Sequence, residues 1–230
     1  MSFDLANLEK TIGLKFTNKE FLVSAFTHRS FLNENPTHKG EHNERLEFLG
    51  DAVLELVVTD HLYGEYDNPE GDLTNWRAAL VNSKMLARVA TELQFEEFIQ
   101  LSRGEAKDTG RARQYILANA FEALVGALYL DKGYNPTKKF IHKHLLRHLD
   151  EVLSEKLYLD PKSHFQEQAQ SQVSITPRYE VEKEWGPDHQ KQFRVGVYLD
   201  EELVAEGEGF SKQAAQEEAA RQALEKKGWS

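Results

Sequence analysis

The most informative stretch of this sequence is His42-Asn43-Glu44-Arg45-Leu46-Glu47-Phe48-Leu49-Gly50-Asp51-Ala52-Val53-Leu54. Its apolar residues recur at three- and four-residue spacing, which predicts an amphipathic helix. Glu44, Glu47 and Asp51 follow the same spacing, so their carboxylates project from one side of that helix. Acidic residues on a helix usually form a solvated face. This helix is largely apolar, however, so we expect the carboxylates at the edge of a core, where a bound cation would offset their cost.

A second polar pair occurs in the nearly apolar stretch from Tyr115 to Ala127. Asn119 and Glu122 are one helical turn apart, so their oxygen atoms face the same way. Two such helices packed together could hold a magnesium ion. Gly50 and Gly126 lie in mid-helix, where glycine costs about 1 kcal/mol. Either the helices approach closely at these positions or the glycines are merely tolerated.

Composition limits the class of protein. The chain has 230 residues, of which 40% are apolar and 29% are charged. No apolar run approaches the ~20 residues of a membrane-spanning helix, so we expect no membrane association. The segment from Met1 to Asn7 lacks the basic start and apolar stretch of a secretory signal, which favours a cytoplasmic location. The absence of cysteine excludes disulfides, thiolate metal sites and a cysteine nucleophile.

The charge balance argues at first against a nucleic-acid partner. With 28 basic and 38 acidic residues, the formal charge is −10, the wrong sign for binding a polyanion by bulk attraction. Net charge does not describe local arrangement. Carboxylates gathered in a cleft bind divalent cations, which in turn attract phosphate.

The pattern predicts two domains. Residues 1–153 read as successive amphipathic helices, residues 154–160 as a linker, and residues 161–230 as a small α-β-β-β-α domain. In the second domain we expect a helix over 163–170, strands over 179–182, 193–199 and 203–208, and a final helix capped by Ser211. The predicted fold is therefore an all-α domain followed by a small α+β domain.

With these motifs in this order, the chain resembles bacterial ribonuclease III. His42–Leu54 is similar to the family's signature, Ile116–Leu130 to its second acidic motif, and Asp160–Lys227 to its double-stranded-RNA-binding domain. The similarity covers nearly the whole chain, and the nine residues Glu44–Ala52 are highly specific.

The resemblance implies a set of site residues. It assigns metal binding to Glu47, Asp51, Asn119 and Glu122, and catalysis to Asp51 and Glu122 with Glu44 as an accessory carboxylate. Glu70 matches a further acidic position near the family's active site, although an acidic residue at a helix start also has a structural explanation.

One position departs from the family pattern. Where the family usually has aspartate, this chain has Asn119, which keeps a carbonyl ligand but removes one negative charge. We expect the chain to be active but to bind the metal less tightly. The alternative is a duplex-RNA-binding protein that has lost cleavage, wholly or largely, because of Asn119.

The residue types favour hydrolysis of phosphodiester bonds. No Ser, His or Cys nucleophile lies beside a base in the motifs, so water must attack phosphorus, and Mg²⁺ held by carboxylates would activate that water. Mn²⁺ is the expected substitute, and no organic cofactor is expected. The resemblance implies a homodimer that cuts both strands of duplex RNA precursors, leaving 5′-phosphate and 3′-hydroxyl ends with short 3′ overhangs. Phe48, Leu49 and Val53 could serve the dimer interface or the core equally well.

In the second domain, the resemblance implies RNA contacts from two helices and a hairpin loop. The first helix would face the RNA minor groove, a loop would enter the next minor groove, and the start of the last helix would face phosphates. Gln213 stands where the family usually has a second lysine, and Asp188 lies in the loop. With nine Lys and Arg against fourteen Asp and Glu from residue 160 onward, we expect weaker binding and a shallower salt dependence. The residues implied to contact RNA are Ser163, Gln166, Glu167, Gln170, His189, Ser211 and Lys212.

His142, His144 and His148 allow a zinc hypothesis, because residues 144 and 148 are one helical turn apart. Further ligands are missing, so exposed histidines are the preferred interpretation. Lys138, Lys139, Lys143 and Arg147 either form a basic edge or belong to a solvated helix face.

Overall fold

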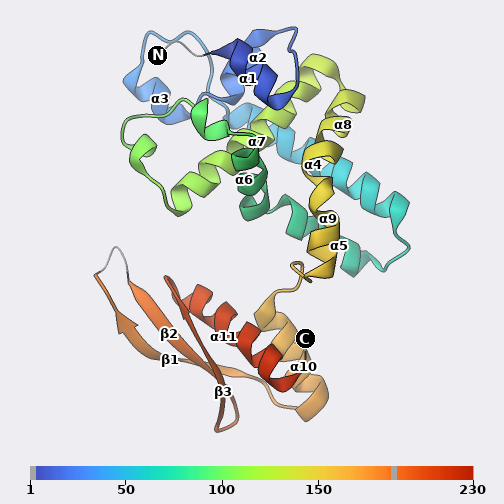
Figure 1. Ribbon diagram of the computed structural model, residues 1–230, viewed down its shortest axis with the longest axis vertical. Coiled ribbons are helices and arrows are strands. Elements are labelled where there is room, and N and C mark those ends of the chain that lie inside the picture. Colours follow the sequence, from blue (N-terminus) through green and yellow to red (C-terminus); the bar gives the residue numbers. More distant parts are fainter. Residues whose placement is uncertain (1–3, 188–190, 230) are drawn as a thin grey trace. The chain divides into compact units, whose positions relative to one another are not determined.

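The computed structural model describes residues 4–187 and 191–229. The chain divides into two compact units, residues 1–158 and residues 159–230 (Figure 1). The first unit is helical and the second contains a three-stranded sheet with two helices, which confirms the predicted fold class. Within the described residues, no helix is both long and apolar enough to cross a membrane.

The first unit is built around two long helices, α4 and α7, which pack against each other. Its α-helices are α1 (Leu5–Ile12), α2 (Lys19–Ala25), α3 (Arg29–Glu34), α4 (Glu44–Glu65), α5 (Glu70–Val81), α6 (Ser83–Glu92), α7 (Arg111–Lys132), α8 (Tyr134–His144) and α9 (Leu149–Ser154). Single 3₁₀ turns are η1 (Phe95–Glu97), η2 (Glu105–Lys107) and η3 (Leu146–His148).

Helix α7 is buried in its middle part, from Ile116 to Leu128, because neighbouring helices surround it there (Figure 1). The rings of Phe95, Phe121 and Phe140 stack in sequence through this core, with centroids 6.4 Å and 6.1 Å apart. Phe121 is fully buried and immediately precedes Glu122. The core therefore fixes the part of α7 that carries the second acidic motif.

Two glycines let α4 and α7 touch backbone to backbone. A Cβ at Gly50 would lie 1.8 Å from the carbonyl oxygen of Glu122, and one at Gly126 would lie 2.2 Å from that of Leu46. No side chain fits in either place. The close helix approach that the sequence allowed is therefore confirmed, and it brings the acidic positions of the two helices together.

The second unit has an antiparallel sheet in the order β1-β2-β3, covered on one face by two helices. Its elements are α10 (Pro161–Val173), β1 (Arg178–Trp185), β2 (Gln192–Leu199), β3 (Glu202–Gly209) and α11 (Lys212–Lys227). Phe165, Val197 and Leu224 lie in its core. The Oγ of Ser211 accepts a hydrogen bond from the backbone N–H of Ala214 at 3.1 Å, which confirms the predicted helix cap.

Small residues let α11 lie close to the sheet. Ala215, Ala219 and Ala220 are fully buried, whereas Ala214 is exposed. A Cβ at Gly209 would lie 2.6 Å from the backbone nitrogen of Ala215. The first turn of α11 is therefore held directly against the end of β3.

Candidate active site and RNA-facing residues

The three carboxylates of the first motif lie in the first turns of α4. Asp51 is exposed, Glu47 is half-buried, and Glu44 is exposed with its carboxylate 3.3 Å from the guanidinium of Arg29 and 3.8 Å from Nδ1 of His42. Acidic groups near a helix N-terminus interact favourably with the helix dipole. This position stabilises Glu44 and Glu47, although the carboxylates also repel one another.

The second motif meets the first across the contact between α4 and α7. Asn119 and Glu122 are half-buried, and the side chain of Asn119 hydrogen-bonds with the carboxylate of Glu47. Burial raises the pKa of Glu122 to about 8, and the nearby charges of Asp51 and Glu47 contribute in the same direction. The structure therefore brings together all four residues expected to bind metal.

The pKa of Glu47 is also raised, first by burial and then by the charges of Glu44 and Asp51. Burial and the neighbouring carboxylates thus both disfavour the charged forms of Glu47 and Glu122. Binding of a cation would stabilise the charged forms of these carboxylates. Their oxygen donors are those that Mg²⁺ prefers.

The side chains are not already arranged as a complete metal cage. Within the described residues, no group of three or more His, Asp or Glu side chains could hold a metal ion by itself. Mg²⁺ usually keeps several waters and binds one or two carboxylates together with substrate phosphates. An open, oxygen-rich cluster with an amide at Asn119 therefore fits this ion better than a closed structural site.

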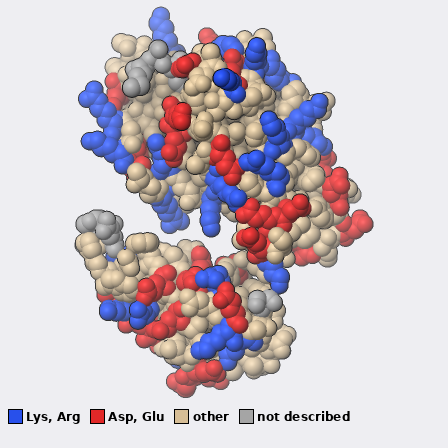
Figure 2. Space-filling view, viewed as in Figure 1, with Lys and Arg blue, Asp and Glu red and all other residues tan. Residues whose placement is uncertain are grey.

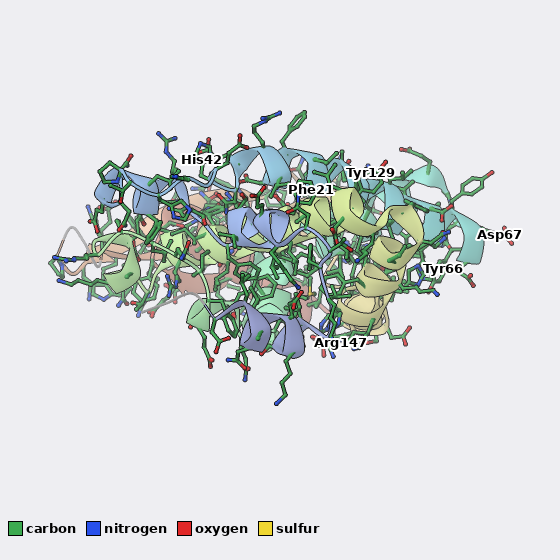
Figure 3. The ribbon with its side chains drawn as sticks, turned by 90° about the horizontal axis from the view of Figure 1, so that it is seen from above. Phe21, His42, Tyr66, Asp67, Tyr129 and Arg147 are labelled. Atoms are coloured by element: carbon green, nitrogen blue, oxygen red, sulfur yellow. The ribbon has the colours of Figure 1, made fainter. Side chains whose placement is uncertain are left out.

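Glu70 lies elsewhere in the unit. It begins α5, accepts a hydrogen bond from Thr74 at 3.1 Å, and lines a hollow with Tyr63 and Arg77 near the C-terminal end of α4. Figure 3 shows His42 and Asp67, which precede and follow α4, at opposite ends of that helix. Glu70 thus does not join Asp51 and Glu122 within one chain. Its position at a helix start agrees with the structural explanation.

The sequence favoured exposed histidines in the region of α8, and this prediction is wrong for His144 and His148. His144 and His148 are 8% and 7% exposed. Positions 137, 140, 141 and 144 follow helical spacing and form the inner face of α8, so a histidine there enters the core. Burial lowers the pKa of His144 to about 4, which keeps the ring neutral.

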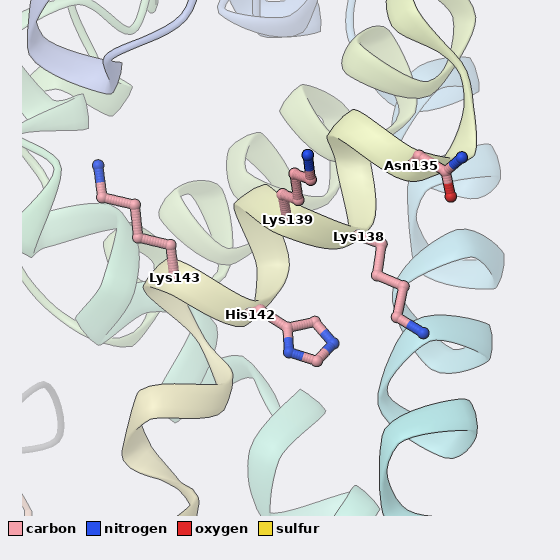
Figure 4. A pocket seen from close by; sticks show the side chains of 5 residues that line it. All are labelled: Asn135, Lys138, Lys139, His142 and Lys143. Atoms are coloured by element: carbon pink, nitrogen blue, oxygen red, sulfur yellow. The ribbon is translucent and has the colours of Figure 1, made fainter. Parts of the chain in front are cut away.

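The lysines of α8 surround a shallow hollow on the helix surface together with Asn135 and His142 (Figure 4). Figure 4 shows Lys139 and Lys143 on one side of α8 and Lys138 on the other. Lys138 forms an ion pair with Asp60 of α4. The residues that line this basic hollow all belong to α8.

In the second unit, the residues expected to contact RNA lie on exposed surface. Gln166, Glu167 and Gln170 point away from the core on α10, and Ser163 donates a hydrogen bond to Asp160 at 2.7 Å. Lys212 is exposed in the first turn of α11. His189 and Asp188 lie outside the described residues.

Sequence reasoning missed three residues around Lys212. Glu184 of β1 forms an ion pair with it at 3.3 Å, and Phe193 of β2 lies beneath its ammonium group. Lys191 shares both neighbours. Part of this could have been found from the sequence, since Lys191 lies two residues before Phe193 and alternate residues of an extended segment point the same way.

Comparison with known proteins identifies both units of the chain. A model of ribonuclease-III-like domains matches residues 18–149, and one of the double-stranded RNA binding motif matches residues 161–227. Ribonuclease 3 of Dehalococcoides mccartyi is 42% identical over 223 residues, covering 96% of this chain and 94% of that protein. Ribonuclease 3 of Streptococcus pneumoniae is 44% identical over 220 residues, covering 95% and 94%.

A solved structure gives a similar result for the first unit. The nuclease domain of ribonuclease III from Campylobacter jejuni matches with a TM-score of 0.55 and 39% identity, covering 64% of this chain and 97% of that one. The helical fold of the first unit and the RNA-binding motif of the second agree with these relatives. The chain therefore belongs to the ribonuclease III family and is an endoribonuclease of double-stranded RNA.

Proposed function

We propose that this endoribonuclease hydrolyses duplex RNA with Mg²⁺, and that Glu47, Asp51, Asn119 and Glu122 hold the ion. The observation that carries the proposal is the cluster of raised-pKa carboxylates where α4 and α7 touch. Bound Mg²⁺ would supply charge stabilisation for in-line attack by water on phosphorus. The protein's own contribution is to hold the carboxylates close together on rigid helices.

The four residues have different tasks in this proposal. Glu122 carries a proton at neutral pH in the metal-free protein, because its pKa is about 8, and must release that proton when a cation binds. In the metal-free protein, the carboxylate of Glu47 accepts a hydrogen bond from the Asn119 amide. This bond uses an N–H of the Asn119 amide, so the Oδ1 of Asn119 stays available to a cation. Glu44 remains on Arg29 at the edge of the cluster.

Asn119→Asp is expected to lower the Mg²⁺ concentration that gives half-maximal cleavage, with a smaller change in rate at saturation. Aspartate restores a negative charge at this ligand position. A Mg²⁺ titration of both proteins measures the effect, with binding to duplex RNA in Ca²⁺ expected to stay similar. Asn75→Asp, an exposed substitution on α5, adds the same charge away from the cluster and serves as the control. Superimposable titration curves for all three proteins would show that Asn119 does not bind the metal.

We propose further that each cut leaves a 5′-phosphate and a 3′-hydroxyl, with short 3′ overhangs produced by two sites acting on opposite strands. The family resemblance supports these ends. Mapping both termini of the fragments from a duplex of known sequence tests them. Blunt fragments, or fragments with 3′-phosphates, would contradict this part of the proposal.

Two sites on one duplex require two copies of the chain, and the first unit offers a surface for a second copy. Phe48 follows Glu47 on α4, and its side chain is 81% exposed. It lines a hollow together with the apolar side chains of Phe21, Leu49 and Leu130 and with polar residues that include Glu41 and Arg45. In a two-fold dimer, each Phe48 would fill the partner's hollow. Val53 is buried and belongs to the core instead. The nuclease domain from Campylobacter jejuni is itself described as having a region involved in dimer formation.

A chain ending after Tyr158 is expected to fold as a helical dimer and to lose most affinity for duplex RNA at physiological salt. Tyr158 packs its ring 6.1 Å from that of Trp76, and Glu151 pairs with Arg88 at 2.6 Å, so residues up to 158 belong to the first unit. Sedimentation tests the dimer, and a gel-shift titration tests the RNA affinity. A monomeric truncated chain would contradict the paired-site proposal, and unchanged affinity would remove the role of the second unit.

A further inference from the structure

Three residues form a row across the sheet of the second unit at the end nearest the start of α11. Glu184 of β1 pairs with Phe193 of β2, which pairs with Gly209 of β3. The first turn of α11 lies against Gly209, since a Cβ there would meet the backbone of Ala215 at 2.6 Å. This register places the Glu184 carboxylate and the Phe193 ring beside the start of α11, which carries Lys212.

Two lysines converge on this row. The Nζ atoms of Lys191 and Lys212 lie 5.6 Å and 5.7 Å from the centroid of the Phe193 ring, within range of a cation–π interaction. The Glu184 carboxylate pairs with both lysines, with Oε2 2.7 Å from Nζ of Lys191 and Oε1 3.3 Å from Nζ of Lys212. One carboxylate thus bridges two ammonium groups that share one aromatic ring.

This arrangement suits a phosphodiester group. Like a carboxylate, a backbone phosphate carries one negative charge and presents two oxygens that accept hydrogen bonds from separate donors. The side chains of Glu184, Lys191 and Lys212 are 36%, 39% and 59% exposed, so a large ligand can reach them. The two ammonium groups therefore provide donors for a single phosphate, provided that the Glu184 carboxylate moves aside.

The cluster also accounts for the departure of α11 from the family pattern. Gln213 stands where a second lysine is usual, and its amide donates to Glu217 at 2.9 Å. The start of α11 thus presents one lysine to RNA. Lys191, which lies 21 positions earlier in the chain, supplies a second positive charge beside it.

We propose that Lys191 and Lys212 form a clamp for one backbone phosphate of duplex RNA, and that Glu184 is the internal counterion which the RNA must displace. The proposal rests on the binding of duplex RNA by the second unit. It adds Lys191 and Phe193 to the RNA-binding surface and gives Glu184 an opposing effect on affinity. Acidic and basic side chains are interleaved on the visible face of this unit in Figure 2. Competition between carboxylates and RNA phosphates for the lysines therefore matters more here than in a basic domain.

The clamp predicts opposite effects for its two kinds of charge. Lys191→Gln and Lys212→Gln should each weaken duplex binding about five- to tenfold near 0.1 M salt, because each variant loses one positive charge and one donor to the phosphate. Glu184→Gln should tighten binding about threefold, because the lysines no longer need to leave a carboxylate. It should also steepen the dependence of affinity on salt, since removing one fixed negative charge lets the cluster hold more mobile anion, which RNA then releases.

Glu202→Gln is a matched control. Glu202 pairs with Lys227 at 2.9 Å, so this change removes the same charge and breaks the same kind of ion pair. Lys227 ends α11, a helix of 16 residues and hence about 24 Å long, so it lies well beyond the ~10 Å Debye length from Lys212 at 0.1 M salt. Glu202→Gln should therefore leave affinity and its salt dependence nearly unchanged.

The experiment is a fluorescence-anisotropy titration of the full chain with a duplex RNA longer than the ~16 base pairs that one such domain spans, in EDTA to prevent cleavage, at several salt concentrations. Thermal unfolding of each variant verifies its fold. The clamp is supported if Lys191→Gln loses as much affinity as Lys212→Gln and Glu184→Gln binds more tightly than Glu202→Gln. Wild-type affinity in Lys191→Gln, or no gain in Glu184→Gln over its control, would overturn it. A wild-type chain that does not bind the duplex at all would instead contradict the function of the whole unit.

Discussion

Glu122→Gln is expected to abolish cleavage while duplex RNA binding remains. The substitution keeps the size of the side chain but removes one ligand charge from the cluster with Glu47 and Asp51. Loss of a partner outside the ligand set typically costs 10- to 100-fold in metal affinity or activity, so loss of a ligand should cost at least about 100-fold. Cleavage at saturating Mg²⁺ and a gel shift in Ca²⁺ measure the two properties. A variant that cuts at nearly the wild-type rate would refute the role of the second acidic motif.

The same substitution should stabilise the metal-free protein in a pH-dependent way. Because the folded-state pKa of Glu122 is about 8 and its ordinary value is 4.5, the folded chain keeps a proton that the unfolded chain releases between these values. The Glu122 contribution to stability is therefore fully present below pH 4.5 and is lost as pH rises to 8. Gln has no such loss. Since Glu122 is only partly buried, we expect roughly 1–2 kcal/mol at pH 8, or about 2–8 °C in Tm.

Thermal unfolding of both proteins in EDTA at pH 5 and pH 8 measures this difference. The Tm of Glu122→Gln should exceed that of the wild type slightly at pH 5 and by more at pH 8. Mg²⁺ should reduce this difference in Tm, because it stabilises the wild type. An advantage that did not change with pH would show that the Glu122 carboxyl is not under electrostatic strain. Such a trade between stability and activity is common where like charges are held together for function.

Gly50→Val is expected to destabilise the first unit by about 3 kcal/mol or more and to abolish cleavage. The Cβ position at Gly50 lies 1.8 Å from the backbone carbonyl oxygen of Glu122. Because backbone cannot turn aside as a side chain can, the two helices must separate. Separation would also pull the α4 carboxylates away from Glu122.

Gly64→Ala on the same helix is the control for this prediction. It has no atom within 4 Å of its Cβ position, so the added methyl group should leave stability unchanged or raise it by up to about 1 kcal/mol. Denaturant unfolding of both variants and of the wild type provides the comparison. If Gly50→Val were as stable as the wild type, the backbone contact between α4 and α7 would not exist in solution.

The acidic cluster could be predicted largely from spacing. Glu47 and Asp51 lie four residues apart on one helix, Asn119 and Glu122 lie three apart on another, and Gly50 and Gly126 allow the two helices to touch. Local periodicity carries this information. Spacing could not give the protonation of Glu122 or the bond between Asn119 and Glu47, because both depend on how deeply the helices bury these groups.

Other features depended on contacts between distant segments. Periodicity left Phe48 and Val53 undecided between core and interface, and only packing separates them into an exposed and a buried side chain. His144 and His148 follow the helical spacing of core residues, which the polar character of histidine obscured. The meeting of Glu184 with Lys212 required the strand register and the docking of α11, neither of which local pattern determines.

Incubation of the full chain with a long duplex RNA, across a Mg²⁺ titration and then in excess EDTA, tests the central claim most directly. The carboxylate cluster at Glu47, Asp51 and Glu122 predicts fragmentation of the duplex that rises with Mg²⁺ and stops when EDTA is added, while single-stranded RNA of the same sequence stays intact. Duplex RNA that is bound yet remains intact at every Mg²⁺ concentration, or that is cut equally well in EDTA, would contradict the account.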